Sequence, residues 1–294
     1  MTLACENLRF AYSRAGRAVI NDLSVRFAPG RLTAIIGANG CGKSTLLRLL
    51  LGTLQPLSGR VTLDGVDLKT IAPALRARRL AYVAQRPALN EAFTARRVVQ
   101  LSRYAFSSPI GPGRDSAASD NHAAVQSALN LTDAQELADR PFGELSAGQQ
   151  QRVSLARALA QLHRPTPTQS SGILLADEPC SAMDPRHEQH AMRLVRSLCT
   201  PSRESHDHPQ STASTTVLVV LHDLSVVARF CDDVLIMNPL GNVITHAPVH
   251  EALTPAHLRE AFQTGFRIVR ESSTTPGGTD PSRILAVVPD DELR

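Results

Sequence analysis

Nine consecutive residues have the composition of a loop that binds the phosphates of a nucleotide. They are Gly37, Ala38, Asn39, Gly40, Cys41, Gly42, Lys43, Ser44 and Thr45, and they fit the pattern G-x-x-x-x-G-K-[ST]. Glycines let backbone N–H groups point inward at an anion, and a helix that begins there adds the positive end of its dipole. The lysine can reach the β- and γ-phosphates, and the Ser44 hydroxyl can bind Mg²⁺. The segment therefore predicts a phosphate site of the kind found in many NTPases.

The residues around this segment have the structure that the motif requires. Residues 32–36 form a short continuous apolar run, which is typical of a buried parallel strand. Residues 43–51 carry an apolar pattern with helical spacing. A strand, a glycine-rich loop and a helix in this order predict an α/β fold with a P-loop NTPase core.

The remaining patterns describe the elements that must position this loop. Alternating residues 3–12, 19–27 and 60–63 predict an antiparallel β subdomain, and apolar runs at 173–176 and 217–221 predict further buried strands of a parallel sheet. Between residues 85 and 160, helical patterns at 123–129 and 150–162 dominate, and we expect the Pro-, Gly- and Ser-rich residues 107–121 to be a flexible loop. The order of elements predicts a parallel core with an inserted helical subdomain.

Domain boundaries follow from composition. Residues 164–172, 200–216 and 271–282 are rich in Ser, Thr and Pro and are interpreted as linkers. With no internal repeat, we expect one ATPase domain over residues 1–270, a helical subdomain at about 86–160, and a tail at 271–294. The longest apolar runs are too short to span a bilayer, and the first residues do not resemble a secretory signal.

Charge and cysteine usage exclude some functions. A net charge of +4 with no tryptophan gives little support for nucleic-acid binding, so we expect no nucleic-acid partner. The five cysteines are scattered without a C-x-x-C pair, which favours reduced thiols over a zinc or redox site.

A second motif separates the classes of NTPase. Residues 145–152 read Leu-Ser-Ala-Gly-Gln-Gln-Gln-Arg and closely resemble the L-S-G-G-Q signature of ATP-binding cassette (ABC) ATPases. Ser146 and Gly148 stand at the start of a helical pattern, where a hydroxyl and backbone N–H groups can bind an anion. Taken alone, the same residues also fit a serine-capped helix with a glycine in its first turn.

Further residues match the ABC ATPase family in the family's order. The resemblance implies that Tyr12 stacks on adenine and that Gln85 contacts Mg²⁺ and the attacking water. It implies that Asp177 holds Mg²⁺ together with Ser44, that Glu178 is the general base, and that His222 senses the γ-phosphate beside Lys43. Singly, Tyr12 also fits a strand aromatic, Glu178 a surface acid and His222 a loop histidine.

The family's architecture implies a pair of chains. A second copy of this chain would cover the bound ATP with residues of its signature and of the loop that crosses the dimer interface. Those residues are Ser146, Ala147, Gly148, Gln149 and Asp184. The resemblance further implies two transmembrane permease subunits, a periplasmic or extracellular substrate-binding protein that acts through them, and a place on the cytoplasmic face of the inner membrane.

The sequence departs from the family pattern at three positions. Ala147 replaces the first signature glycine, Ala38 stands where proline is common, and Cys180 stands where threonine is common. The extra methyl group of Ala147 near a phosphate predicts weaker ATP-driven dimerisation or slower turnover rather than loss of activity.

The cargo is predicted by resemblance alone. Residues 101–104, 184–190 and 221–224 resemble the importer branch for iron chelates, haem and cobalamin, and His187 with His190 is most similar to haem-import ATPases, although Glu188 departs from that pattern. We therefore expect haem import. Ferric siderophore or cobalamin import, an exporter ATPase, a soluble ABC ATPase and an inactive regulatory cassette remain alternatives, as does direct binding of haem or metal by the histidines.

Overall fold

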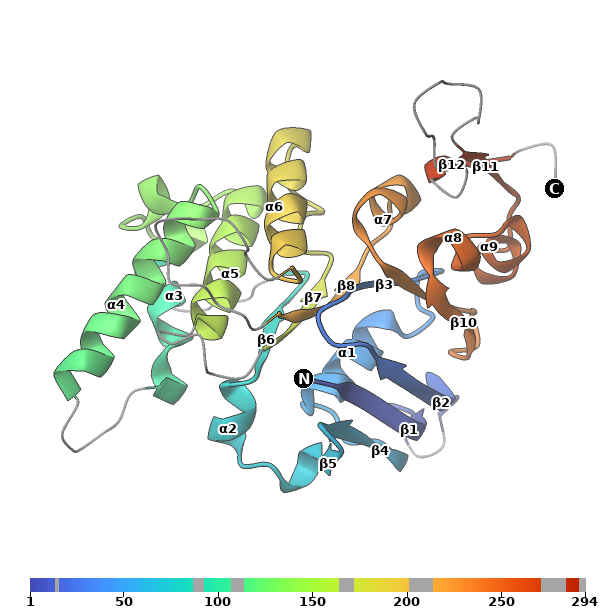
Figure 1. Cartoon of the computed structure of the whole chain (residues 1–294), viewed down its shortest axis with the longest axis horizontal. Coiled ribbons are helices and arrows are strands. Elements are labelled where there is room, and N and C mark those ends of the chain that lie inside the picture. Colours follow the sequence, from blue (N-terminus) through green and yellow to red (C-terminus); the bar gives the residue numbers. More distant parts are fainter. Residues whose placement is uncertain are drawn as a thin grey trace. The chain divides into compact units, whose positions relative to one another are not determined.

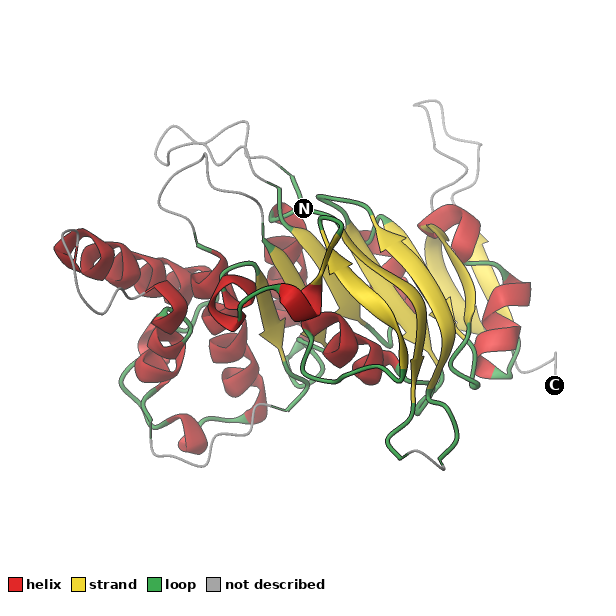
Figure 2. Cartoon of the chain, turned by 90° about the horizontal axis from the view of Figure 1, so that it is seen from below, coloured by secondary structure: helices red, strands yellow, loops and turns green. Residues whose placement is uncertain are grey.

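The computed structural model describes residues 1–13, 16–86, 93–106, 114–163, 172–200, 214–270 and 284–290. The chain forms two compact units (Figure 1). The first contains Met1 and residues 70–217, and the second contains residues 2–69 and 218–294. Among the described residues, the longest helices belong to the first unit and most strands to the second. Figure 2 shows the helices in red and the strands in yellow.

An antiparallel sheet begins the second unit. Its strand order is β2-β1-β4-β5, with β1 at Leu3–Phe10, β2 at Ile20–Phe27, β4 at Ser58–Leu63 and β5 at Val66–Asp67. Alternate residues of β2 are buried, as expected for a strand with one face on the core. The predicted antiparallel strands are therefore confirmed.

The strand before the phosphate loop is buried on both faces. All six residues of β3 (Leu32–Gly37) are buried, and β3 pairs in parallel with β9 (Asp233–Met237), which pairs antiparallel with β10 (Val243–Pro248). The side chains of Leu46, Leu47 and Leu50 on α1 (Lys43–Leu51) are fully buried, and each contributes about 1.5–3 kcal/mol. The predicted strand, loop and helix are confirmed.

The rest of the second unit lies toward the C-terminus. Its helices there are α7 at Leu224–Phe230, α8 at Val249–Ala252 and α9 at Pro255–Phe262. Earlier in the chain, a short 3₁₀ helix η1 (Leu68–Thr70) directly follows β5. Strand β11 (Phe266–Arg270) pairs antiparallel with β12 (Ile284–Pro289), and β12 packs on α7. The sequence patterns above give no element in the tail, although the apolar run that starts at Ile284 is a strand signal.

The first unit contains the parallel pair β6 (Leu80–Val83) and β7 (Ile173–Asp177). Its helices are α2 at Pro73–Ala77, α3 at Ala95–Leu101, α4 at Arg114–Leu131, α5 at Ala147–Leu162 and α6 at Pro185–Ser197. Three 3₁₀ helices are η2 at Tyr104–Phe106, η3 at Gln135–Leu137 and η4 at Phe142–Glu144. Helices α3, α4 and α5 pack on one another, which confirms the helical insertion.

One predicted loop is shorter than expected. Helix α4 begins at Arg114, so residues 114–121 are helical and the prediction of a loop throughout 107–121 is wrong for them. The proline and glycine residues of this stretch all precede Arg114, and the residues that follow have no helix breaker. The linkers predicted at 164–172, 200–216 and 271–282 lie largely outside the described residues.

Strand β8 (Thr216–Val220) begins in the first unit and ends in the second, and all five of its residues are buried. Within the described parts of the chain, no helix has both the length and the hydropathy that a membrane span requires.

Candidate nucleotide site

The phosphate loop, residues 37–42, lies in the second unit between β3 and α1. Gly42 and Gly40 have φ angles of 105° and 79°, in the left-handed region that favours glycine. A Cβ on Gly42 would lie 2.9 Å from the carbonyl oxygen of Val19, whereas a Cβ on Gly40 would meet nothing within 4 Å. Gly42 is therefore required by packing, and Gly40 leaves open space on the exposed side of the loop.

Lys43 holds the phosphate loop in a closed curve through hydrogen bonds to the backbone at the start of the loop. Its Nζ donates hydrogen bonds to the carbonyl oxygens of Gly37 at 2.8 Å and Ala38 at 3.0 Å, and its side chain is buried. In the part of the chain that the structure describes, no side chain caps α1 at Gly42, and the first turn contains no acidic residue. An ammonium group and the N-terminal N–H groups of α1 therefore meet at this loop, which is a suitable arrangement for an anion.

Tyr12 is tied to the same helix. Its hydroxyl group and the Oγ1 of Thr45 share a hydrogen bond of 2.9 Å, and its ring packs edge-on against Phe10 at 5.0 Å. The Tyr12 side chain is nonetheless 62% exposed, so the ring offers surface on which a base can stack. The bond to Thr45 is not predictable from the sequence, because strand and loop patterns do not encode which hydroxyl groups meet.

Cys41 lies inside the loop but is buried. Burial raises the pKa of its thiol, and the positive charge of Lys43 partly opposes that rise. Cys41 is therefore a neutral packing residue at physiological pH, and it lies near enough to Gly37 that a Cβ there would be 2.9 Å from its sulfur. Asn39 is exposed and Ser44 is half-buried at the start of α1.

His222 also belongs to the second unit. It is exposed and follows β8 by two residues, directly before α7. The next residue, Asp223, caps α7 by accepting hydrogen bonds from the backbone N–H groups of Ser225 at 2.7 Å and Val226 at 3.2 Å. This cap fixes the chain where His222 stands.

The acidic residues of the candidate site lie in the first unit, at the end of β7. Asp177 is buried as the last residue of that strand, and Glu178 follows with φ 48°. Val83 of β6 is paired with Ala176 in the parallel ladder, so Gln85 and Asp177 follow paired positions at the same edge of the sheet. Gln85 is exposed there. The structure therefore brings the predicted glutamine and both carboxylates to one sheet edge.

The signature segment, residues 146–149, begins α5. Ser146 Oγ accepts a hydrogen bond from the backbone N–H of Gln149 at 3.3 Å, and Gln149 Oε1 accepts one from the N–H of Ser146 at 3.0 Å. These two bonds form a capping box. The serine-capped helix that the sequence left open is thus present, and it leaves Ala147 exposed beside the cap.

Gly148 faces the other way from Ala147. A Cβ on Gly148 would lie 2.6 Å from the carbonyl oxygen of Ala182, so the start of α5 touches the chain that follows β7. Glycine is required at this position because the contact is backbone against backbone. The methyl group of Ala147, in contrast, is added on the exposed side of the helix.

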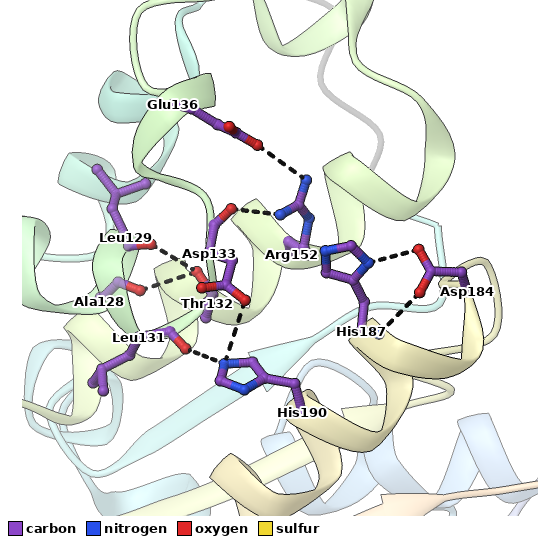
Figure 3. A network of polar contacts seen from close by, with 10 residues as sticks. All are labelled: Ala128, Leu129, Leu131, Thr132, Asp133, Glu136, Arg152, Asp184, His187 and His190. Carbon is purple, nitrogen blue, oxygen red and sulfur yellow. Dashed lines mark hydrogen bonds and ion pairs between the residues drawn. The ribbon is translucent and has the colours of Figure 1, made fainter.

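Asp184 is the N-cap residue of α6 and is held by local bonds (Figure 3). Its Oδ1 accepts from the N–H groups of Arg186 and His187, each at 3.0 Å, and its Oδ2 lies 2.6 Å from His187 Nδ1. These bonds lower the pKa of Asp184. The carboxylate therefore acts as the cap of α6 within this chain.

Of the paired histidines, His190 connects α6 to the end of α4, whereas His187 bonds to Asp184 at the start of its own helix. His190 Nε2 donates to the carbonyl oxygen of Leu131 at 2.8 Å and lies 3.8 Å from Asp133 Oδ2 (Figure 3). Arg152 of α5 donates to the carbonyl oxygen of Asp133. Over the described residues, no three side chains of His, Cys, Asp or Glu gather as metal ligands. His187 and His190 thus have structural contacts inside the first unit.

Comparison with known proteins shows which family the chain is similar to. The family model described as ABC transporter matches residues 20–181. The hemin import ATP-binding protein HmuV of Bordetella pertussis is 37% identical over 98% of this chain and 99% of its own length.

Two solved structures have the same fold. One is a transporter described as of the metal-chelate type, in an inward-facing conformation, with a TM-score of 0.71, 23% identity and coverage of 98% of this chain and 97% of its own. The other is a dimeric ATP-binding cassette bound to ADP and Pi, with a TM-score of 0.66, 22% identity and coverage of 84% and 98%.

Proposed function

Because this chain belongs to the ABC transporter family, we propose that it is the ATP-hydrolysing subunit of an importer whose cargo is haem. The observation that carries the ATPase part is the phosphate loop, in which Lys43 and the start of α1 form an anion site. The similarity to a hemin import protein over nearly its whole length supports haem as cargo.

The phosphate loop binds the triphosphate in this proposal. Backbone N–H groups of residues 39–43 donate to phosphate oxygens, and Lys43 exchanges its bonds to the loop carbonyls for bonds to the β- and γ-phosphates. Tyr12 stacks on the adenine, for which its exposed ring is suited. The backbone N–H groups and Lys43 neutralise or spread phosphate charge, so the site favours ATP over an uncharged nucleoside.

Hydrolysis needs a base and a polar environment around the γ-phosphate. Glu178 accepts a proton from water as the water oxygen attacks the γ-phosphorus and the bond to the β–γ bridging oxygen breaks. Gln85 orients that water, and Lys43 and His222 stabilise the charge of the transferring group. Oxygen donors suit Mg²⁺. Ser44, Asp177 and Gln85 would hold it, and it would neutralise phosphate charge there.

Two copies of the chain act together in this proposal. Ser146, Ala147, Gly148, Gln149 and Asp184 of one copy cover the ATP on the phosphate loop of the other. The uncovered start of α5 supports this role, because Ala147 is exposed and the helix N-terminus favours an anion. Binding of ATP then holds the copies together, and hydrolysis releases them.

The pair works on two transmembrane permease subunits at the cytoplasmic face of the inner membrane. A periplasmic or extracellular substrate-binding protein delivers the cargo to those subunits. Association and release of the ATPase pair change the conformation of the permease.

Hydrolysis is tested with the purified chain and Glu178→Gln. We expect Mg²⁺-dependent ATP hydrolysis by the wild type and a loss of at least about 100-fold in the variant, because the carboxamide cannot accept the proton. Glu144→Gln, at a second acid of the same unit, is the control and retains activity. Equal activity of Glu178→Gln and the wild type would show that Glu178 is not the general base.

The cargo is tested by deleting the gene and measuring uptake. We expect haem uptake to be lost and restored by the wild type, but not by Glu178→Gln. Loss of ferric siderophore or cobalamin uptake with haem uptake intact would replace haem by that cargo, and loss of an export activity would contradict an importer.

A further inference from the structure

Gln151 occupies a buried position on α5, two residues after the signature segment. Its side chain is 3% exposed. Its amide contacts a single stretch of chain, residues 178–182, which follows β7 and is called here the post-strand turn. The proposed function assigns a role to Glu178 in this turn but none to Gln151.

Three hydrogen bonds join the Gln151 amide to the post-strand turn. Nε2 donates to the carbonyl oxygen of Glu178 at 3.2 Å and to Oγ of Ser181 at 3.0 Å. Oε1 accepts from the backbone N–H of Ala182 at 2.9 Å. Ser181 Oγ in turn donates to the carbonyl oxygen of Glu178 at 3.2 Å, which closes the network. Both donor hydrogens and the acceptor of one amide are therefore used.

The bonds act where the backbone is strained. Glu178 has φ 48°, a left-handed conformation that a residue with a side chain adopts only when its surroundings enforce it. Its carbonyl oxygen accepts from two donors, Gln151 and Ser181, which both favour that conformation. The direction in which the Glu178 side chain leaves the backbone thus depends on the Gln151 amide.

The same turn is in contact with the start of α5. Gly148 lies one helical turn before Gln151, and a Cβ there would be 2.6 Å from the carbonyl oxygen of Ala182. Ala182 is therefore held at its N–H by Gln151 and approached at its carbonyl oxygen by Gly148. A displacement at the start of α5 must displace the post-strand turn as well, because the two backbone segments are in close contact with no space between them.

The neighbouring side chain secures α5 on its other side. Arg152 donates to the carbonyl oxygen of Asp133 and lies 3.9 Å from Glu136, so α5 is also attached to the end of α4 (Figure 3). Gln151 and Arg152 together hold α5 between these two parts of the first unit.

We propose that Gln151 is a positioning residue for ATP hydrolysis, which orients Glu178 and makes its orientation depend on the signature segment of the same chain. The proposal rests on the proposed function, because it assumes that Glu178 is the base. In the dimer, the signature segment of a chain meets the ATP bound by its partner. Gln151 thereby links occupancy of one ATP site to the base of the other.

The variant Gln151→Met tests the proposal because it keeps the length of the side chain but loses all three bonds. Gln161→Met is the matched control: Gln161 lies on the same helix and its Nε2 donates to the carbonyl oxygens of Ala77 at 2.6 Å and Leu80 at 2.9 Å, away from the post-strand turn. Both variants lose part-buried hydrogen bonds of a side-chain amide, so both are expected to unfold at a lower temperature.

Only Gln151→Met is expected to lose turnover. We expect kcat to fall at least about tenfold, with the dissociation constant of ATP for the single chain changed less than about twofold, and the Hill coefficient for ATP to fall toward 1. In Gln161→Met, kcat and the Hill coefficient should stay near wild type. A kcat of Gln151→Met within twofold of wild type, or an equal loss in both variants, would overturn the proposal.

A second variant guards against misfolding of the first. Gln151→Glu keeps the acceptor for the Ala182 N–H but loses both donors, so we expect it to fold and to lose kcat as well. Wild-type turnover in Gln151→Glu would show that the bond from Gln151 to the Glu178 carbonyl oxygen does not orient Glu178, and it would overturn the proposal. If the wild-type chain itself hydrolysed no ATP, the proposed function would fail, irrespective of the variants.

Discussion

At the scale of single residues, the candidate site depends on a few polar contacts that are short and specific. The bond between Tyr12 and Thr45 is one of them, since it ties an exposed aromatic ring to the helix that begins at the phosphate loop. The bonds of Lys43 to two loop carbonyls are another. For Tyr12, the contribution of the ring to ATP binding can be separated from that of the hydroxyl group, by substitutions that remove the whole ring or only the hydroxyl group.

Tyr12→Ala is expected to weaken ATP binding by about 1–3 kcal/mol, which is the usual value for the loss of one aromatic stack on a base. Tyr12→Phe keeps the ring and loses only the hydroxyl bond to Thr45, so its ATP affinity should stay close to that of the wild type. Isothermal titration of each single chain measures both constants. Equal losses in the two variants would mean that the hydroxyl group, and not the stack, matters.

The cap of α6 makes stability depend on pH. Hydrogen bonds from His187 lower the pKa of Asp184 from its ordinary 3.8, so the charged form is favoured in the folded chain. The contribution of this carboxylate to the free energy of unfolding is complete at pH values above its pKa in the unfolded chain. It is lost as the pH falls through its lower pKa in the folded chain. Asp184→Asn keeps a capping oxygen but loses the charge.

We therefore expect the wild type to unfold at a higher urea concentration than Asp184→Asn at pH 7, with the two midpoints converging as the pH falls toward 3. Urea titrations at several pH values measure this difference. A gap that stays constant over the whole range would show that the charge of Asp184 does not contribute.

At the scale of elements, much of the site was predictable because local patterns determine it. The helix expected at residues 43–51 is α1, and the apolar run at 173–176 is β7. Parallel pairing then brings Gln85 and Asp177 to one edge, as the order of elements indicates. The roles assigned to these residues remain predictions.

Contacts between distant segments were not predictable from those patterns. The three bonds of Gln151 join residues 27 to 31 positions apart in sequence, and a glutamine on a helix is most often a solvated residue. The apolar run of β12 is a strand signal, but its partner strand β11 is separated from it in sequence by residues 271–283. Tertiary pairing, rather than local propensity, decides such contacts.

The start of α5 gives a prediction about packing. Gly148→Ala places a methyl group 2.6 Å from the carbonyl oxygen of Ala182, which we expect to lower the free energy of unfolding by about 1–3 kcal/mol. Ala147→Gly, at the exposed neighbour, should cost no more than about 1 kcal/mol, through helix propensity.

Urea unfolding of both variants measures these costs, and ATP hydrolysis measures the second effect. Since Ala147→Gly removes the methyl group that sets this signature apart, its turnover should equal or exceed that of the wild type. Lower turnover with unchanged stability would show that the alanine is favourable in this chain.

At the scale of the whole molecule, the residues assigned to ATP come from both compact units. Lys43 and His222 belong to one unit, and Gln85, Asp177 and Glu178 belong to the other. The proposed pair of chains adds the signature segment of a second copy.

A dimer that depends on ATP is the prediction at this scale. Glu178→Gln binds ATP without hydrolysing it, so in ATP it should sediment with the mass of two chains, and in ADP with that of one. Adding Lys43→Ala should abolish the dimer, because the β- and γ-phosphates lose their cation. A dimer of equal stability in ADP and ATP would contradict the proposal that dimerisation requires the γ-phosphate.

The closed curve of the phosphate loop has a consequence for the rate of binding. Because Lys43 already bonds to Gly37 and Ala38, the loop takes its shape from contacts within the chain, and a nucleotide meets a ready-made receptor. When the nucleotide binds, the bonds of Lys43 to the loop carbonyls are replaced by bonds to phosphates. The loop loses little conformational entropy in this step. Association should be a single fast phase proportional to nucleotide concentration, with no slow isomerisation after the first encounter.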